Sequence, residues 1–108
     1  MVAMLVLALA SAAFGQKKSK QPTERSVSGV VTDAGGNPVP NAIVQLKNLK
    51  TLQVRSFIAK DTGEYFFMGL ALDTDYELKA ESNGKSSATR TLSSLDGRTE
   101  VKINLQLK

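Results

Sequence analysis

The 108-residue chain contains no histidine and no cysteine. Histidine is the usual general base near neutral pH, cysteine is the usual thiolate nucleophile, and the two together supply most zinc ligands. Their absence excludes histidine-based or cysteine-based catalysis, zinc sites of these ligands, and disulfide bonds. The fold must therefore depend on packing and strand pairing, and we expect no catalytic residue, no cofactor, no metal site and no enzymatic activity.

Aromatic side chains are also scarce, at 6% of the residues. The net charge is +4, but outside a short cluster at residues 17–20 the Lys and Arg residues are scattered along the chain. Binding of single-stranded nucleic acid needs aromatic residues for stacking, and nucleic-acid binding in general favours a concentrated basic stripe. The composition therefore predicts no nucleic-acid partner.

The first fifteen residues, MVAMLVLALASAAFG, form an uncharged apolar run that ends in small residues. Such a run is typical of a secretory signal peptide, with Ala13 and Gly15 at the small-residue positions before the cleavage point, although no Lys or Arg precedes it. It is shorter than the stretch of about 20 apolar residues that crosses a bilayer. We predict a signal peptide at 1–15, a disordered polar lead-in at 16–24, and a secreted or periplasmic product without stable membrane insertion after cleavage. An uncleaved amphipathic or buried helix is the alternative.

From Arg25 onward, apolar and polar residues alternate with a period of two, and turn residues recur at short intervals. This rhythm predicts an all-β sandwich or a small barrel over residues 25–108. No segment after Gly15 favours a helix. Seven strands are expected, in the segments RSVSGVVT, AIVQLKN, TLQVRSFIAK, EYFFMGL, DTDYELKAES, KSSATRTLSS and TEVKINLQLK.

Three of these segments carry more specific predictions. In the third, Leu52, Val54 and Ile58 share a face, which leaves Phe57 on the opposite face. The fourth is nearly continuous in apolar residues, so it is expected to be covered on both sides or to lie at the centre of the sandwich. The polar sixth segment, Lys85–Ser94, is expected at an edge.

The run VSGVVTDAGGNPVPNAIVQL at 27–46 resembles the opening of carboxypeptidase regulatory-like domains, which are seven-stranded prealbumin-like sandwiches. The segments AKDTGEYFFMGL at 59–70 and DYELKA at 75–80 are similar to the central hairpin of that family and to the strand after it. The resemblance covers about 27–107 and implies an antiparallel Greek-key β-sandwich. It marks positions that specify the fold, none of them catalytic: Gly29, Pro38, Ala42, Gly63, Tyr65, Phe67 and Tyr76.

Within this resemblance, Gly29 is expected to permit close backbone approach across the sheets, and Pro38 to stiffen the first loop. Ala42 must be small where the chain re-enters the core, and Gly63 turns the central hairpin. Tyr65, Phe67 and Tyr76 are expected to fill the interior.

Asp73 and Asp75 are the best candidates for a calcium site, because carboxylates in one loop could supply oxygen ligands. No Asp-x-Asn-x-Asp-Gly cage is present, so a solvated turn is the favoured interpretation. The other acidic residues mostly lie in turns as well, where Asp commonly accepts local backbone hydrogen bonds.

Two kinds of function remain. The first is a binding or scaffold module of the cell envelope that engages a protein through loops or an edge strand such as Lys85–Ser94. The alternative is a carbohydrate-binding module, since sandwiches of this type also resemble starch-binding modules. Sugars stack on exposed aromatics, and Phe57 and Phe66 lie opposite to the expected core positions. Phe57, Phe66, Asp73 and Asp75 therefore make up the predicted binding surface, with an envelope protein or a glycan as partner.

Overall fold

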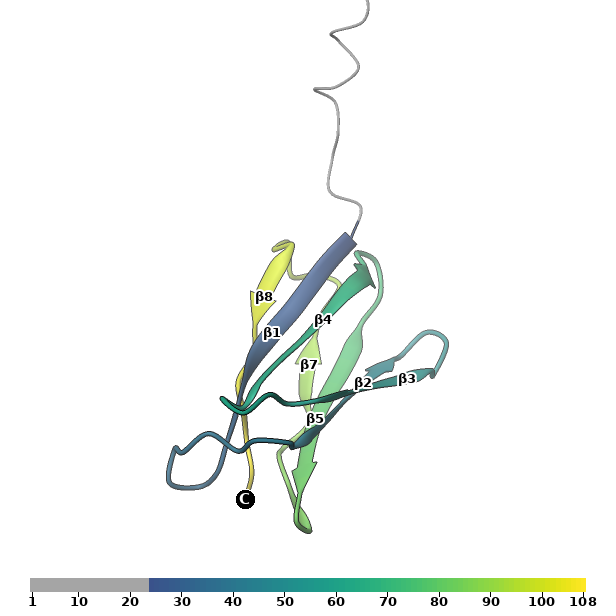
Figure 1. The fold of residues 1–108 in the computed structure, drawn as a ribbon. Coiled ribbons are helices and arrows are strands. Elements are labelled where there is room, and N and C mark those ends of the chain that lie inside the picture. Colours follow the sequence, from purple (N-terminus) through teal and green to yellow (C-terminus); the bar gives the residue numbers. More distant parts are fainter. Residues whose placement is uncertain (1–23) are drawn as a thin grey trace, which may run out of the picture.

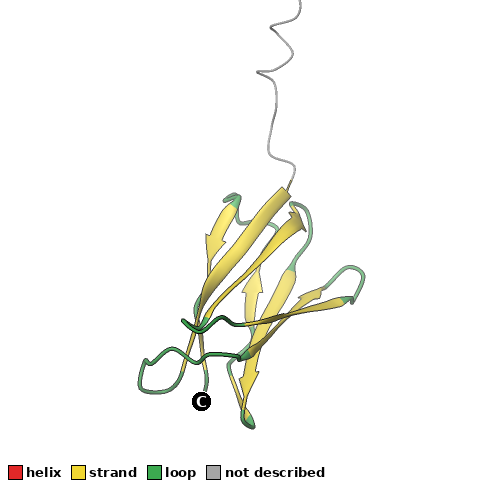
Figure 2. Ribbon diagram, viewed as in Figure 1, coloured by secondary structure: helices red, strands yellow, loops and turns green. Residues whose placement is uncertain are grey.

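The structure is a computed structural model that describes residues 24–108; the predicted signal peptide at 1–15 and residues 16–23 of the predicted lead-in lie outside the described residues. All regular secondary structure between Glu24 and Lys108 is β-strand (Figure 2). Within this range there is no helix that could cross a membrane. The strands form two sheets, which confirms the predicted β-sandwich.

The first sheet contains four strands in the order β4-β1-β8, with β9 also paired to β1 (Figure 1). Its strands are β1 (Glu24–Thr32), β4 (Glu64–Ala71), β8 (Glu100–Lys102) and β9 (Leu105–Gln106). The second sheet contains five strands in the order β3-β2-β5-β6, with β7 also paired to β5. Its strands are β2 (Ile43–Asn48), β3 (Val54–Ile58), β5 (Tyr76–Ser82), β6 (Lys85–Ser86) and β7 (Arg90–Leu92).

The sequence predicted seven strands, whereas residues 24–108 form nine, because two of the predicted segments are interrupted. The sixth segment divides into β6 and β7, and the last divides into β8 and β9. Pairing is also not wholly antiparallel as predicted, since β8 and β9 both run parallel to β1. The last segment crosses over from the five-stranded sheet and reaches β1 in the same direction.

The interruption between β8 and β9 has a clear cause at Ile103 and Asn104. In a continuous parallel ladder, the carbonyl of Ile103 would accept a hydrogen bond from the amide of Val30. Instead Val30 donates to Oδ1 of Asn104 at 3.0 Å, and the carbonyl of Ile103 turns inward to accept from the buried Tyr65 hydroxyl. Gly29 makes room for this turn, because a Cβ there would lie 1.8 Å from the Ile103 oxygen. The predicted close approach at Gly29 is therefore to the segment between β8 and β9, beside β1 in its own sheet, and not across the sheets.

The core lies between the inner faces of the two sheets. In the first, second, fifth and last segments the alternating apolar residues face this core, and Ala42, Tyr65, Phe67 and Tyr76 are buried as expected. The buried apolar residues are Val27, Val31, Ala42, Val44, Leu46, Ala59, Tyr65, Phe67, Leu70, Tyr76, Leu78, Ala80, Leu92, Val101, Ile103, Leu105 and Leu107.

Three predictions about the middle of the chain are wrong. In β3 the side chains of Val54 and Ile58 face solvent, and Phe57 points inward and packs against the core. β4 is an edge strand with one buried face, not a strand covered on both sides. The turn at 61–63 does not close a hairpin, because β3 and β4 belong to different sheets. Gly63 does turn the chain there, with a φ of 80° and its amide donating to the carbonyl of Lys60.

Candidate functional site

The sandwich has two long sides where the edges of its sheets meet. We call the side formed by β3 and β4 the open side, and the side formed by β6, β7, β8 and β9 the closed side. Each side consists of one edge of the four-stranded sheet and the neighbouring edge of the five-stranded sheet. They differ in how their backbone groups are used.

On the closed side, the C-terminal segment joins the two sheets. Ser87 forms an isolated bridge with Leu107, and the amide of Lys108 donates to the carbonyl of Ser86 at 3.1 Å. Arg90 adds a hydrogen bond from Nη1 to the carbonyl of Asn104 at 3.2 Å. The prediction that Lys85–Ser94 lies at an edge is confirmed, but this edge is short, interrupted and already bridged.

A cleft of about 430 Å³ lies on the closed side and is lined in part by Ala88 and Lys108, which follow the two bridging residues in the sequence. Its described lining residues include no aromatic side chain, so it offers no stacking surface for a sugar. They are Thr32, Ala88, Arg90, Asn104, Leu105, Gln106 and Lys108.

On the open side, β3 pairs with β2 along one edge only, and no other described strand pairs with it. Its neighbours in the ladder fix the hydrogen-bonding direction: the amide of Asn48 donates to Gln53, and the amide of Ala59 donates to Ala42. Because this direction alternates along an antiparallel strand, the N–H and C=O groups of Val54, Ser56 and Ile58 point away from β2. They form an unpaired edge.

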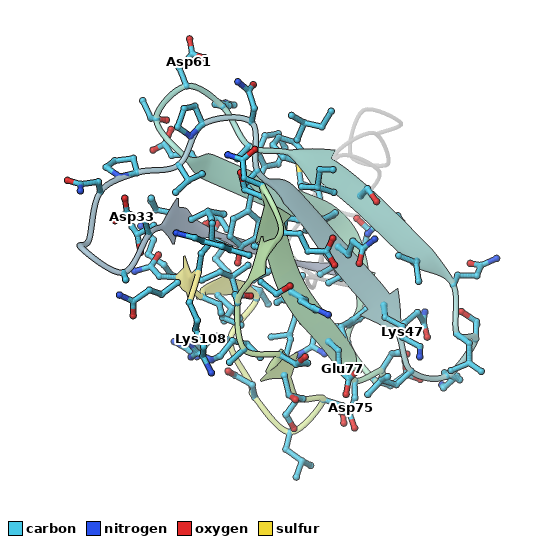
Figure 3. The ribbon with its side chains drawn as sticks, turned by 90° about the horizontal axis from the view of Figure 1, so that it is seen from below. Asp33, Lys47, Asp61, Asp75, Glu77 and Lys108 are labelled. Atoms are coloured by element: carbon cyan, nitrogen blue, oxygen red, sulfur yellow. The ribbon has the colours of Figure 1, made fainter. Side chains whose placement is uncertain are left out.

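The side chains of the same β3 residues lie on the outer face of the five-stranded sheet. Val54 is 53% exposed and Ile58 is 63% exposed, and Ile58 lies opposite the partly exposed Ile43 of β2. Exposed apolar residues on an open strand edge favour pairing with another strand. On the same sheet Lys47 of β2 and Glu77 of β5 are opposite each other, and Figure 3 shows their side chains close together.

The edge of β4 is only partly open, because two of its outward carbonyls, those of Glu64 and Met68, accept hydrogen bonds from Lys60 and Arg55. Gly63 accepts from Val31 on β1, so the alternation directs the backbone groups of Phe66 away from β1. On its outer face Phe66 is 40% exposed and Met68 is 63% exposed. Arg55 of β3 links the two edges, because its Nη2 donates to the Met68 carbonyl at 3.1 Å.

Phe57 and Phe66, two of the predicted binding residues, are brought together on the open side. Their ring centroids lie 4.9 Å apart with the planes tilted by 55°. Phe57 also meets Phe67 of the core at 6.1 Å, and the ammonium of Lys60 lies 5.4 Å from the centre of the Phe66 ring. The pair closes the side of the core and leaves Phe66 as the more exposed ring, so the two do not form a flat platform.

Asp73 and Asp75, the other two predicted residues, bind different neighbours. Asp73 accepts from the Thr74 hydroxyl and lies 3.5 Å from Nζ of Lys50, and both contacts lower its pKa. Asp75 accepts from the amide of Ser94 at 2.6 Å, which lowers its pKa. Within residues 24–108 there is no cluster of three or more acidic side chains that could hold a metal ion.

Arg25 is a structural residue that sequence reasoning missed. It is only 2% exposed, and its guanidinium donates to the carbonyls of Ala71, Thr74 and Ser93. These contacts join the start of β1 to the β4–β5 and β7–β8 connections. Arg25 is charged and follows a polar segment, so its burial was not expected from the sequence. The one available signal was its position two residues before Val27, in phase with the inward residues of β1.

The comparisons with known proteins agree with this architecture. The sequence model of the carboxypeptidase regulatory-like domain matches residues 26–108. A search of curated protein sequences finds no match.

Three solved structures illustrate the likeness in fold. Catechol 1,2-dioxygenase from Acinetobacter sp. ADP1 aligns with a TM-score of 0.59 and 13% identity over 82% of this chain and 53% of that one. The dioxygenase domain of a dioxygenase carbohydrate-binding protein fusion from Streptomyces sp. SirexAA-E gives 0.58 and 12%, covering 83% and 82%. The C-terminal domain of the shaft pilin SpaA from Lactobacillus rhamnosus GG gives 0.54 and 12%, covering 81% and 100%.

At these identities the structural likeness shows the fold alone, and the chain spans about half of the first structure, with 53% covered. The match to the family model extends over most of the sequence and includes every described strand from Ser26 onward. The chain therefore belongs to the family of carboxypeptidase regulatory-like domains.

Proposed function

We propose that this chain is an exported, non-catalytic module of the cell envelope that binds a protein partner by strand addition at β3. The observation that carries the proposal is the unpaired edge of Val54, Ser56 and Ile58, which combines free backbone groups with exposed apolar side chains. A partner strand in extended conformation gains main-chain hydrogen bonds here, and its alternate side chains cover Val54 and Ile58. Export rests on the apolar run at 1–15.

The edge of β3 suits this role better than the predicted edge at Lys85–Ser94. β3 is a continuous strand of five residues, whereas β6 and β7 have two and three. The polar residues of β6 and β7 also discourage pairing. The nearby Phe66 and Met68 extend the apolar surface of the open side around the edge of β4.

A non-catalytic role is supported by the absence of histidine and cysteine from the whole sequence. Domains of this family usually act as non-catalytic modules. Several carboxylates are also held in local hydrogen bonds, as Asp33 is by the amides of Gly35 and Asn37. Such carboxylates serve turns and are not convergent acid and base groups.

The test is the substitution Ser56→Pro. The amide of Ser56 points to the free edge, so proline removes a donor that the fold does not use, and edge strands tolerate proline. The tagged chain is used to capture proteins from an envelope extract, with and without soluble glycans. We expect a protein partner that binds the unaltered chain and Ser56→Ala but not Ser56→Pro. A partner retained by folded Ser56→Pro contradicts strand addition at β3.

Carbohydrate binding is a second candidate, and it is favoured by the exposure of Phe66 beside Phe57. An aromatic ring with an accessible face can stack on a sugar. Two results would favour carbohydrate binding over strand addition. One is release of the captured partner by a soluble glycan, and the other is retention of a polysaccharide that is lost in Phe66→Ala.

A further inference from the structure

We infer that the strand that pairs with β3 is the β3 strand of a second copy of this chain, so that the domain forms a two-fold dimer through a continuous ten-stranded sheet. The inference rests on the proposed function, because it names the partner of the same edge. The sheet of one copy contributes five strands, ending at β3. A two-fold axis perpendicular to the sheet joins two such edges in antiparallel orientation, in which each contact occurs twice.

The pattern of side chains selects one register, with Ser56 opposite Ser56 of the second copy. Val54 then faces Ile58 at both ends of the pair. These three positions are the ones whose N–H and C=O groups point to the free edge, so they become hydrogen-bonded pairs of the new ladder. On the outer face, Val54 extends the apolar row that Ile58 and Ile43 already form across β3 and β2.

The inner face of the same register is also complementary. Arg55 of one copy lies opposite Phe57 of the other, and Phe57 lies opposite Arg55. A guanidinium beside an aromatic ring is a favourable cation–π pair. The guanidinium of Arg55 already lies 5.8 Å from the centre of the Phe67 ring in its own copy, so the side chain is close to aromatic residues before any dimer forms. No two like charges face each other across the axis.

Neighbouring registers lack this complementarity. A shift by two residues in one direction places Arg55 opposite Arg55, which is destabilising for like charges on facing strands. A shift in the other direction places Phe57 opposite Phe57, but it puts Ile58 opposite Ser56 and Val54 opposite Lys60, beyond the end of β3. A shift by one residue would instead place Val54 opposite Phe57 and turn the outer face of one copy to the inner face of the other.

The β2–β3 hairpin projects from the side of the sandwich, away from β1 and β8 (Figure 1). The exposure of Val54 and Ile58 on its outer strand is what contact with a second copy requires. Two strands of five residues make an interface at the small end of specific contacts, so we expect a weak dimer that is best measured by cross-linking and at high protein concentration.

The chain has no cysteine, so a single introduced cysteine reports one contact. In the inferred register, Ser56→Cys places two thiols on the axis, with Cα atoms about 5.5 Å apart and within disulfide range. Gln45→Cys is the matched control: Gln45 lies opposite Ser56 on β2 and is exposed on the same face. Its two copies would lie about 14 Å apart, three strand spacings, beyond disulfide range.

We expect mild oxidation to convert Ser56→Cys to a covalent dimer, while Gln45→Cys remains monomeric on non-reducing gels. Sedimentation of the unaltered chain and of Ser56→Ala should show a dimer that is lost in Ser56→Pro. Equal cross-linking of both cysteine variants, together with a monomer at concentrations up to about 1 mM, overturns the inference. Strand addition to a different protein survives that result if Ser56→Pro still abolishes capture; it fails as well if capture is unchanged.

Discussion

The two long sides of the sandwich use their edge strands in opposite ways. On the closed side, Ser87 bridges Leu107, and the short strands β6 and β7 are polar. On the open side, β3 and β4 have no described strand beyond them, and both present apolar side chains to solvent. The domain therefore protects one pair of edges with its own chain and leaves the other pair available. Substitutions on the closed side should reduce stability, and those on the outer surface of the open side should reduce binding.

The largest effect is expected for Gly29→Ala in β1, where the chain contacts the last segment of the closed side. The added Cβ would lie 1.8 Å from the backbone oxygen of Ile103, so the last segment must leave its position against β1. We expect a loss of more than about 3 kcal/mol in the free energy of unfolding, measured by urea denaturation. Gly97→Ala is the control, because a Cβ there meets nothing within 4 Å. Similar stability of both variants would contradict the role of the turned carbonyl.

Arg25→Met should have the next largest effect, because Arg25 links the connections at one end of both sides. Its removal leaves the carbonyls of Ala71, Thr74 and Ser93 without this donor. Burial of unsatisfied polar groups predicts a loss of about 2–3 kcal/mol in the free energy of unfolding. The control is Arg98→Met, whose exposed pair with Asp96 should contribute little. If the two variants unfold at the same urea concentration, the contacts of Arg25 do not stabilise the domain.

Tyr65→Phe removes only the hydroxyl that binds the turned carbonyl of Ile103. The ring still fills the core, so we expect a loss of about 1–2 kcal/mol in the free energy of unfolding. Burial raises the pKa of the Tyr65 phenol above its ordinary value. The absorbance change of Tyr65 should therefore occur at a higher pH in the folded chain than in the unfolded chain. Titration of Tyr65 at the same pH in the folded and the unfolded chain would mean that this hydroxyl is accessible to water.

The two phenylalanines test the open side directly. Phe57→Ala should destabilise the domain by about 2 kcal/mol, since its ring packs against the core, whereas Phe66→Ala should cost less than about 1 kcal/mol. Both free energies come from urea denaturation. If both variants are unfolded, Phe66 is a core residue and cannot be a ring on which a sugar stacks.

The smallest effect is expected in the loop after β7, which belongs to neither side. The side chain of Arg98 donates to Asp96 and holds the pKa of that carboxyl at about 2. Because the pKa is lower in the folded chain, the pair stabilises the fold above the ordinary carboxyl pKa, and this contribution is lost as the pH falls toward 2. In Arg98→Gln the carboxyl resonance of Asp96 should titrate at a higher pH in an NMR experiment. An unchanged midpoint would assign the shift to the backbone amide instead.

Much of the fold could be predicted from the sequence, because strands with one buried face carry a period of two. The inward positions of β1, β2 and β5 follow this rule, as do Val101, Ile103, Leu105 and Leu107. The open side could not be predicted in this way. The outer residues of β3 and β4 are apolar, so in the sequence they cannot be distinguished from core residues. For this reason Phe57 was predicted to face outward and β4 to be a central strand.

The candidate site was therefore only partly visible in the sequence. Phe57 and Phe66 were predicted to be part of one exposed binding surface. Their rings do meet, but they meet because Phe57 packs against the core at the edge of the sandwich and Phe66 covers it. Asp73 and Asp75 are separated only by Thr74 in the sequence, yet hydrogen bonds direct them to Lys50 and Ser94. Which edge remains unpaired depends on the order of strands in the sheets, and strand order is not encoded in a local pattern.

The parallel pairing of the last segment with β1 also determines how the domain responds to force. β1 begins at one end of the domain, and the C-terminal end lies at the other (Figure 1). Tension between Glu24 and Lys108 would slide these neighbouring strands past each other, so the hydrogen bonds between them would bear the load together and would not open one after another. The hydrogen bond from the Tyr65 hydroxyl to the carbonyl of Ile103 lies between β8 and β9 and would further resist this sliding. A module attached at both ends would resist extension through its central strand.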